Sequence, residues 1–161
     1  MPQFHLVRRI RERISLLGDR AAQRAHVNGQ WRVTSWRALG EAMDGCARAL
    51  IHAGHQPGEM VGIHARNMPE WTQADLGILA ARGVRVPIYP TSAPDQISYI
   101  LRDARIRLLF AGEQPQFDRA LESLLPRAFS VQTGELTPTL KLRRSIEANY
   151  RDETEGMYAT G

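Results

Sequence analysis

Between residues 60 and 124, short apolar runs alternate with longer segments whose apolar residues recur at helical spacing. This alternation constrains the fold more than any other feature of the sequence. The runs Met60–His64, Val84–Ile88 and Ile106–Phe110 each have the length of a buried β-strand. Strands that alternate with helices form parallel sheets, because each helix carries the chain back to the start of the next strand. We therefore expect an α/β fold: a partial layered sheet of mostly parallel strands with right-handed crossover helices.

The segments between the strands are predicted to be helices that lie on the sheet. Asn67 is expected to cap a helix that has Pro69 in its first turn and continues to Gly83, and Pro94 is expected to open the next helix. The predicted apolar faces are Trp71, Ala74, Ile78 and Ala81; Ile97, Ile100, Leu101 and Ala104; and Phe117, Ala120, Leu121 and Leu124.

The chain before residue 60 predicts two helices and a hairpin. Leu6, Ile10, Ile14 and Leu17 fall on one face of a helix that ends at Gly18. The strand-like segments 21–27 and 31–34 flank Asn28-Gly29, the dipeptide most typical of a two-residue hairpin turn. Ser35 is placed to cap a helix that begins at Trp36 and ends near Gly54. Its expected apolar face is Trp36, Leu39, Met43, Cys46, Ala47 and Leu50.

The pattern changes after Leu125-Pro126. A short strand is expected at 128–131, a turn at Thr133-Gly134, a loop around Pro138, and a polar helix from Arg143. We therefore predict two parts: residues 1–125, the α/β part, and residues 126–161, a loop and helix tail.

Composition mainly excludes classes of protein. The chain has 161 residues, of which 43% are apolar and 24% charged, which excludes wholesale disorder, collagen-like repeats and coiled coils. No apolar run approaches the roughly 18 residues that a membrane span needs, so no transmembrane segment is expected. The single cysteine, Cys46, fits a reducing compartment, and Met1–Leu17 lacks the features of a secretory signal. We expect a cytoplasmic protein and leave peripheral membrane contact open.

The basic character of the chain does not by itself indicate a nucleic-acid site. The net charge is +4 and the pI about 9.8, and twenty of the 21 basic residues are arginines. These arginines are interleaved with acidic residues from Arg8 to Arg151, which is typical of a solvated surface. We expect no nucleic-acid partner, and the same interpretation is preferred for Arg143, Arg144 and Arg151 of the predicted final helix.

A long stretch of the chain resembles the beginning of one family of enzymes. The segments that carry the resemblance are Trp36–Glu41, Val61–Ile63, Asn67–Trp71, Asp75–Ala81 and Val86–Ser92, within about residues 1–124. They are similar to the AMP-forming long-chain fatty-acid–CoA ligases of the adenylate-forming, AMP-binding superfamily. The resemblance implies the N-terminal subdomain of an acyl-CoA synthetase-like fold. It also implies a parent reaction in which a fatty acid, ATP and CoA give acyl-CoA, AMP and pyrophosphate.

A second stretch, Gly134–Arg144, resembles the extreme C-terminal motif of the same family. In those ligases the lysine of the motif supports adenylate formation, and Lys141, the only lysine of this chain, occupies its position. The resemblance therefore makes Lys141 the vestigial catalytic residue. It also implies ATP, Mg²⁺ and CoA as the cofactors of the parent enzyme, none of which we assign with confidence to this chain.

The central segments of the family are absent between these two stretches. The sequence has no phosphate-binding loop rich in Gly, Ser and Thr, no aromatic-Gly-x-Thr-Glu segment and no suitably placed Thr-Gly-Asp. We expect a large internal deletion with its join near Leu124–Arg127, arising in the gene or in a mis-assembled gene model. The first hypothesis is a truncated relative that is catalytically incompetent alone. The alternative is a non-catalytic module that binds a ligase protomer or another protein, or self-associates through an exposed sheet edge.

Other residues have chemical and structural interpretations. His52 and His55 lie three residues apart and suggest a metal-binding pair, with His64 further along the chain. No third ligand lies at a characteristic spacing, so no metal is expected. Cys46 is interpreted as a small buried residue rather than a nucleophile. Three aromatic residues suggest a ligand site but are interpreted as core packing: Trp36, Trp71 and Tyr89.

Overall fold

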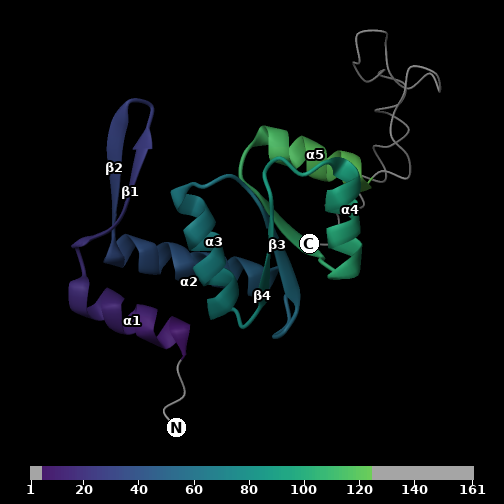
Figure 1. The fold of residues 1–161 in the computed structure, drawn as a ribbon. Helices are drawn as coiled ribbons and strands as arrows, with labels where there is room; N and C mark the ends of the chain where they lie inside the picture. Colours follow the sequence, from purple (N-terminus) through teal and green to yellow (C-terminus); the bar gives the residue numbers. More distant parts are fainter. Residues whose placement is uncertain (1–4, 125–161) are drawn as a thin grey trace, which may run out of the picture. The chain divides into compact units, whose positions relative to one another are not determined.

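The structure, a computed structural model, describes residues 5–124 of the chain. In chain order its elements are α1 (Leu6–Leu17), β1 (Ala21–Val27), β2 (Gln30–Ser35), α2 (Trp36–His52), β3 (Met60–His64), α3 (Pro69–Ala80), β4 (Val84–Ile88), α4 (Pro94–Asp103), β5 (Leu108–Ala111) and α5 (Gln114–Leu124). Every helix and strand predicted within this range is present, with ends displaced by a few residues, and the α/β prediction is confirmed (Figure 1).

The central sheet is parallel, and β3 lies in its middle. The strand order is β4-β3-β5, and the register pairs Gly62 with both Val86 and Leu109. The helix α3 joins β3 to β4, and α4 carries the chain from β4 across to the other side of β3. Because β3 and β4 are parallel neighbours, their carboxyl ends lie side by side at the same end of the sheet.

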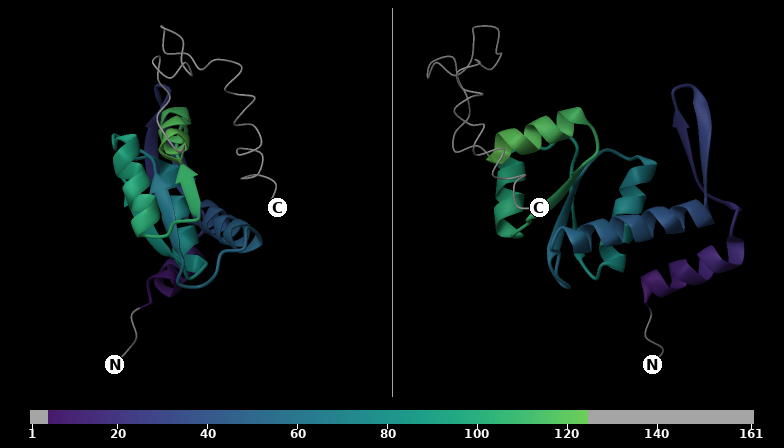
Figure 2. Two further views of the ribbon diagram at one scale, coloured as in Figure 1. Left: turned by 90° about the vertical axis from the view of Figure 1, so that its right-hand side faces the viewer. Right: turned by 180° about the vertical axis from the view of Figure 1, so that it is seen from behind.

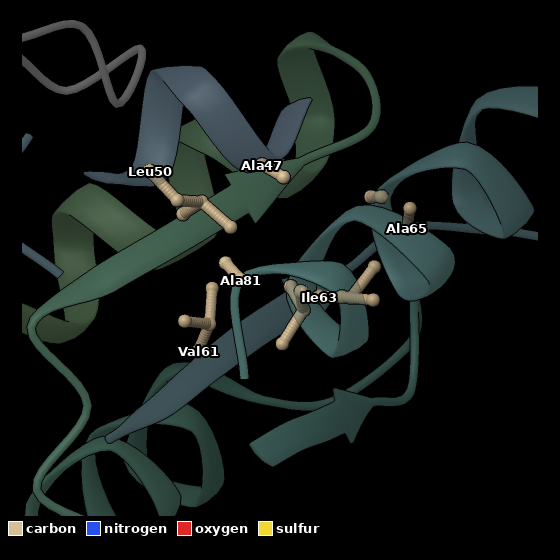
Figure 3. Packing of buried hydrophobic residues seen from close by; sticks show 8 residues of the cluster. Ala47, Leu50, Val61, Ile63, Ala65 and Ala81 are labelled. Carbon is tan, nitrogen blue, oxygen red and sulfur yellow. The ribbon is translucent and has the colours of Figure 1, made fainter. Parts of the chain in front are cut away.

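Helices cover both faces of the sheet, as the apolar patterns predict. One core cluster joins α2 and α3 to β3 through Ala47, Leu50, Val61, Ile63, Ala65, Ala74, Ile78 and Ala81 (Figure 3). A smaller cluster joins α4 to β4 through Ile88, Ile97 and Leu101. Ile63 and Ile78 are at most 1% exposed, and removing each such side chain from water stabilises the fold by about 1.5–3 kcal/mol.

The N-terminal elements pack on α2 instead of on the sheet. Ile10 and Ile14 of α1 contact the cluster formed by Leu39, Met43 and Leu76. Ser35 caps α2 as predicted, because its hydroxyl accepts a hydrogen bond from the Ala38 N–H at 3.1 Å. The hairpin of β1 and β2 extends away from the helices (Figure 2).

Two predictions about helix ends were wrong. Met68 occupies the N-cap of α3 without a side-chain hydrogen bond, so Asn67 does not cap this helix, although Pro69 does open it. α3 ends at Ala80, and Arg82 adopts the left-handed conformation expected of a glycine, with φ of 62°. Gly83 instead leaves room for the buried His55, because a Cβ atom at position 83 would lie 2.7 Å from Nε2 of that histidine.

The predicted apolar face of α5 is only partly correct. Ala120 is buried, but Gln116 and Ser123 accompany it in the interior, whereas Phe117 is 40% and Leu124 is 54% exposed. The face of α5 that is buried is therefore rotated about the helix axis from the apolar face that was predicted. The third strand also begins later than predicted, at Leu108, because Ile106 packs on the α4 cluster before the strand starts.

The predicted tail, residues 126–161, lies outside the described residues, as do the strand, turn and helix expected in it. The boundary between the two predicted parts therefore stays a prediction.

Candidate functional site

The carboxyl ends of β3 and β4 open into a hollow. It has a volume of about 410 Å³ and is lined by Ala65, Asn67, Trp71, Pro87, Ile88, Tyr89 and Pro90. These residues come from the loop after β3, from α3, and from β4 with the turn that follows it. Ligands of open parallel sheets bind outside the carboxyl ends of the strands, so this hollow is the best placed candidate site in the described part of the chain.

Two aromatic residues form the walls, and one of them departs from the prediction of core packing. Tyr89 is 81% exposed and lines the hollow together with Trp71. Trp71 also packs against the core cluster that joins α2 and α3 to β3. Trp36 packs, as predicted, against the cluster of Leu39, Met43 and Leu76. Tyr89 was misjudged because it directly follows a buried strand residue, Ile88, where the alternation of the strand turns its side chain outward.

Tyr89 also borders a second, more polar hollow. It has a volume of about 430 Å³, and its other lining residues are Ser92, Asp95, Gln96, Tyr99 and Ile100. These residues belong to the first turns of α4 and the loop before it. The exposed Tyr89 ring thus separates an uncharged hollow from one that contains a carboxylate, Asp95.

The turn that carries Tyr89 is held from two sides. The Ser92 N–H donates to the Tyr89 carbonyl at 3.0 Å, and Nη1 of Arg119 in α5 donates to the Pro90 carbonyl at 2.8 Å. Gln96 accepts a hydrogen bond from the Ala93 N–H at 3.1 Å, which fixes the start of α4. The position of the Tyr89 ring therefore depends on α4 and α5 as well as on β4.

His64 lies buried at the end of β3, next to this turn. The residue is 0% exposed, and neither ring nitrogen meets hydrogen-bond geometry with a partner among residues 5–124. Burial lowers the pKa of His64, and the nearby backbone of Ile88 offsets this effect only in part. The folded chain therefore favours the neutral form of the His64 imidazole at neutral pH.

The other predicted residues do not assemble into a site. His52 is exposed, whereas His55 is 4% exposed and its Nδ1 lies 3.6 Å from Oε2 of Glu59. Residues 5–124 contain no group of three or more His, Cys, Asp or Glu side chains arranged to hold a metal ion. Cys46 is partly buried between α2 and α3, and burial raises the pKa of its thiol, which disfavours the nucleophilic thiolate.

An ion pair that the sequence did not indicate connects α3 to β4. Oδ1 of Asp75 lies 2.8 Å from Nε of Arg85. Burial raises the pKa of Asp75, and the Arg85 guanidinium opposes that change. The sequence carries no signal for this pair, because the two residues approach each other only when α3 packs beside β4.

The two hollows do not fit a nucleoside triphosphate. Phosphate groups need basic side chains or converging backbone N–H groups, and no lysine or arginine lines either hollow. Lys141 lies outside the described residues, as do Arg143, Arg144 and Arg151, so their predicted roles are untested. Asn67, Pro87 and Pro90 were not predicted as site residues. Their positions just at or after the ends of adjacent parallel strands were the signal that could have identified them.

Comparison with known proteins connects this geometry to a family. The model of the family described as AMP-binding enzyme matches residues 14–156, most of the chain. The chain belongs to the AMP-binding enzyme family. The resemblance noted from the sequence is thereby confirmed at the level of the family.

Curated proteins named as fatty-acid ligases are similar to the chain. The chain is 29% identical over 144 residues to the long-chain-fatty-acid–CoA ligase FadD15 of Mycobacterium bovis, a match that covers 75% of this chain and 24% of that protein. It is 32% identical over 110 residues to the human long-chain-fatty-acid–CoA ligase 1, covering 67% and 15%. The chain thus spans about a quarter or less of the length of these relatives.

Solved structures of adenylate-forming ligases share the fold. The fatty acyl-adenylate ligase of L. pneumophila, in complex with acyl adenylate and pyrophosphate, superposes with a TM-score of 0.67 at 20% identity, covering 80% of this chain and 23% of that one. A benzoate CoA ligase from Burkholderia xenovorans gives a TM-score of 0.66 at 19% identity, covering 78% of this chain and 24% of that one.

None of the helices described between residues 5 and 124 combines the length and the apolar character needed to span a bilayer.

Proposed function

We propose that this chain is a truncated relative of an ATP-dependent long-chain fatty-acid–CoA ligase and is inactive by itself. The observation that carries the proposal is the match of the AMP-binding family model to residues 14–156, together with relatives that are fatty-acid ligases. In the parent reaction, a fatty acid and ATP form an acyl adenylate and pyrophosphate, and CoA then displaces AMP.

Inactivity follows from the charge that adenylation must stabilise. A single lysine neutralises charge on a transferring phosphate only when other groups hold the nucleotide and Mg²⁺ in line. The sequence lacks the phosphate loop and the nucleotide segments of the family, and the two described hollows carry no basic group. Lys141 is therefore proposed as a vestigial adenylation lysine, and ATP, Mg²⁺ and CoA as cofactors of the parent enzyme rather than of this chain.

Exchange of labelled pyrophosphate into ATP tests the proposal. The purified 161-residue chain is incubated with ATP, Mg²⁺ and palmitic acid, and Lys141→Ala serves as the matched control. We expect the same background exchange from both proteins. Exchange above background that Lys141→Ala abolishes would show that the chain is a working adenylating enzyme.

A second candidate function is a non-catalytic module that binds a ligase protomer or another copy of itself. The observation in its favour is that β4 is an outer strand of the sheet formed by the described residues, and its Val84 is 46% exposed. Open edges carry unpaired backbone groups and favour pairing with another chain. Light scattering after size exclusion tests this candidate: a mass that rises with concentration supports it, and a monomer at all concentrations contradicts it.

A further inference from the structure

A third hollow lies between the hairpin and the beginning of α3. It has a volume of about 440 Å³. Its lining comes from residues 23–26 of β1 and from the loop and first turn that begin α3, including Asn67 and Thr72. It shares Asn67 with the hollow beside Trp71 and Tyr89. Within the described chain β1 is the only strand that lines it, and Figure 1 shows β1 on the side of the hairpin nearer to α3.

Arg24 gives this hollow a positive charge that no carboxylate neutralises. Among residues 5–124, no carboxylate oxygen lies within 4.0 Å of the Arg24 guanidinium group. Glu70, the acidic residue in the first turn of α3, is not part of the lining. A guanidinium group binds a carboxylate or a phosphate through two parallel hydrogen bonds. The charge of the hollow therefore suits an oxyanion.

The backbone of β1 supplies further hydrogen-bond donors on the same side. In a hairpin with a two-residue turn, the residues that flank the turn, here Val27 and Gln30, form a hydrogen-bonded pair, and the two kinds of pair alternate from there. Arg24 and His26 are therefore at the non-hydrogen-bonded positions, where N–H and C=O groups point away from the partner strand. Neither N–H has a backbone partner outside the hairpin among residues 5–124, so both are free at the edge that lines the hollow.

The side chains around this edge also suit a ligand with hydroxyl groups. Oε1 of Gln23 is buried and has no hydrogen-bond partner among residues 5–124, and a buried acceptor without a donor destabilises the chain. A hydroxyl group of a ligand is a donor that would satisfy this oxygen. The Asn67 amide and the Thr72 hydroxyl on the opposite wall can each both donate and accept.

We propose that this hollow binds a small soluble molecule that carries both an oxyanion and hydroxyl groups, the chemistry of a sugar phosphate or a hydroxy acid. The Arg24 guanidinium and the N–H groups of Arg24 and His26 donate to the oxyanion. The side chains of Gln23, Asn67 and Thr72 form hydrogen bonds with the hydroxyl groups. The proposal goes beyond the proposed function and does not depend on ligase activity.

Titration of the isotopically labelled 161-residue chain, followed by amide NMR, tests the proposal. Glycerol 3-phosphate and glycerate each carry an oxyanion and hydroxyl groups, whereas inorganic phosphate and glycerol each carry only one of the two. Sodium chloride keeps the ionic strength constant. We expect glycerol 3-phosphate or glycerate to bind at least about fivefold tighter than inorganic phosphate and glycerol, because the added groups form further hydrogen bonds. The tighter of the two shows whether the site prefers phosphate or carboxylate.

Two matched pairs of variants locate the binding. Arg24→Gln should weaken the binding of the tighter probe at least about tenfold, because hydrogen bonds to a charged donor are the strong ones. Arg32→Gln removes the same charge from β2 and should have a much smaller effect. Gln23→Ala should reduce the preference for that probe over inorganic phosphate, whereas Gln30→Ala, an exposed position of β2, should not. Circular dichroism confirms that each variant is folded.

Any of four results would overturn the proposal. The first is that neither glycerol 3-phosphate nor glycerate gives saturable binding. The second is that inorganic phosphate binds as tightly as both, since charge alone would then explain the affinity. The third is equal weakening by Arg24→Gln and Arg32→Gln, and the fourth is saturation that leaves the N–H signals of Arg24 and His26 unshifted. None of these results depends on the outcome of the pyrophosphate exchange experiment.

Discussion

Gly77 of α3 lies against α2 so closely that a side chain does not fit. A Cβ atom at Gly77 would overlap Sγ and Cβ of Cys46, and it would also approach the Met43 carbonyl. This contact lets α3 and α2 pack side by side above the sheet, with Ala47 and Ala74 in the same cluster. A glycine in the middle of a helix otherwise destabilises it, so the close approach is the physical reason for its presence here.

Gly77→Ala is therefore expected to destabilise the fold. Overpacking at this position should lower the free energy of unfolding by about 1–3 kcal/mol, measured by urea denaturation. Gly45→Ala in α2 is the matched control, because the only heavy atom near its Cβ position is the flexible end of Arg48 at 4.0 Å. That variant should stabilise the chain by about 0.5–1 kcal/mol, and a stabilising Gly77→Ala would contradict the observed packing.

The buried His64 makes stability depend on pH. Burial lowers the pKa of His64 below its ordinary value of 6.5, so the unfolded chain binds more protons than the folded chain in this range. Stability should therefore fall as the pH drops from 7.5 to 5.5, with a slope of at most about 1.4 kcal/mol per unit from one group. The ordinary pKa of Asp75 is 3.8, and burial raises it, so its contribution has the opposite sign and begins at lower pH.

Urea denaturation at several pH values measures this slope. His64→Gln should flatten it, whereas His52→Gln, which changes an exposed histidine, should leave it unchanged. An unchanged slope in His64→Gln would show that another group controls the acid sensitivity. A lower stability of His64→Gln at every pH does not affect the comparison of slopes.

At the scale of single elements, the β1–β2 hairpin shows how much a local signal can determine. Asn28 and Gly29 both have positive φ, 50° and 79°, as the two-residue turn predicted from Asn-Gly requires. The register that follows pairs Val27 with Gln30 and His26 with Trp31. By contrast, the rotation of α5 was not predictable, because Gln116 enters the interior only through contacts made after the sheet has assembled.

Gly29→Ala should loosen the hairpin without unfolding the rest of the chain. The left-handed conformation costs a residue with a Cβ atom about 1–2 kcal/mol, although the space around Gly29 is open. Amide hydrogen exchange in β1 and β2 should accelerate roughly fivefold or more, while exchange in β3 stays unchanged. Asn28→Gly, which keeps the turn accessible, should cause a much smaller change, and acceleration in β3 would contradict the local origin of the effect.

At the scale of the whole molecule, the three core clusters lie within residues 5–124. The sequence predicted a boundary at 125/126, where the alternation of strands and helices stops. This boundary is not tested by the structure, but it has a direct experimental consequence.

A chain that ends at Leu125 should unfold cooperatively, with a urea midpoint close to that of the full chain. The reason is that residues 5–124 already contain three clusters of buried apolar side chains, which pack on the sheet and on α2. The control is a chain that ends at Asp103, which lacks β5 and α5 and should lose the cooperative transition. A large fall in the midpoint on removal of residues 126–161 would show that the two predicted parts are one folding unit.

The sequence by itself determined the order and type of the elements and the parallel character of the sheet. It could do so because helical periodicity, strand length and turn residues are local properties of the chain. It also indicated the family, through the segments around Val86–Ser92. The tertiary structure alone decided that Tyr89 and Trp71 face one hollow, that Asn67 lines it instead of capping α3, and that His64 is buried beside it. These facts depend on the strand order β4-β3-β5, which brings the loops after two strands together across 24 residues of sequence from His64 to Ile88.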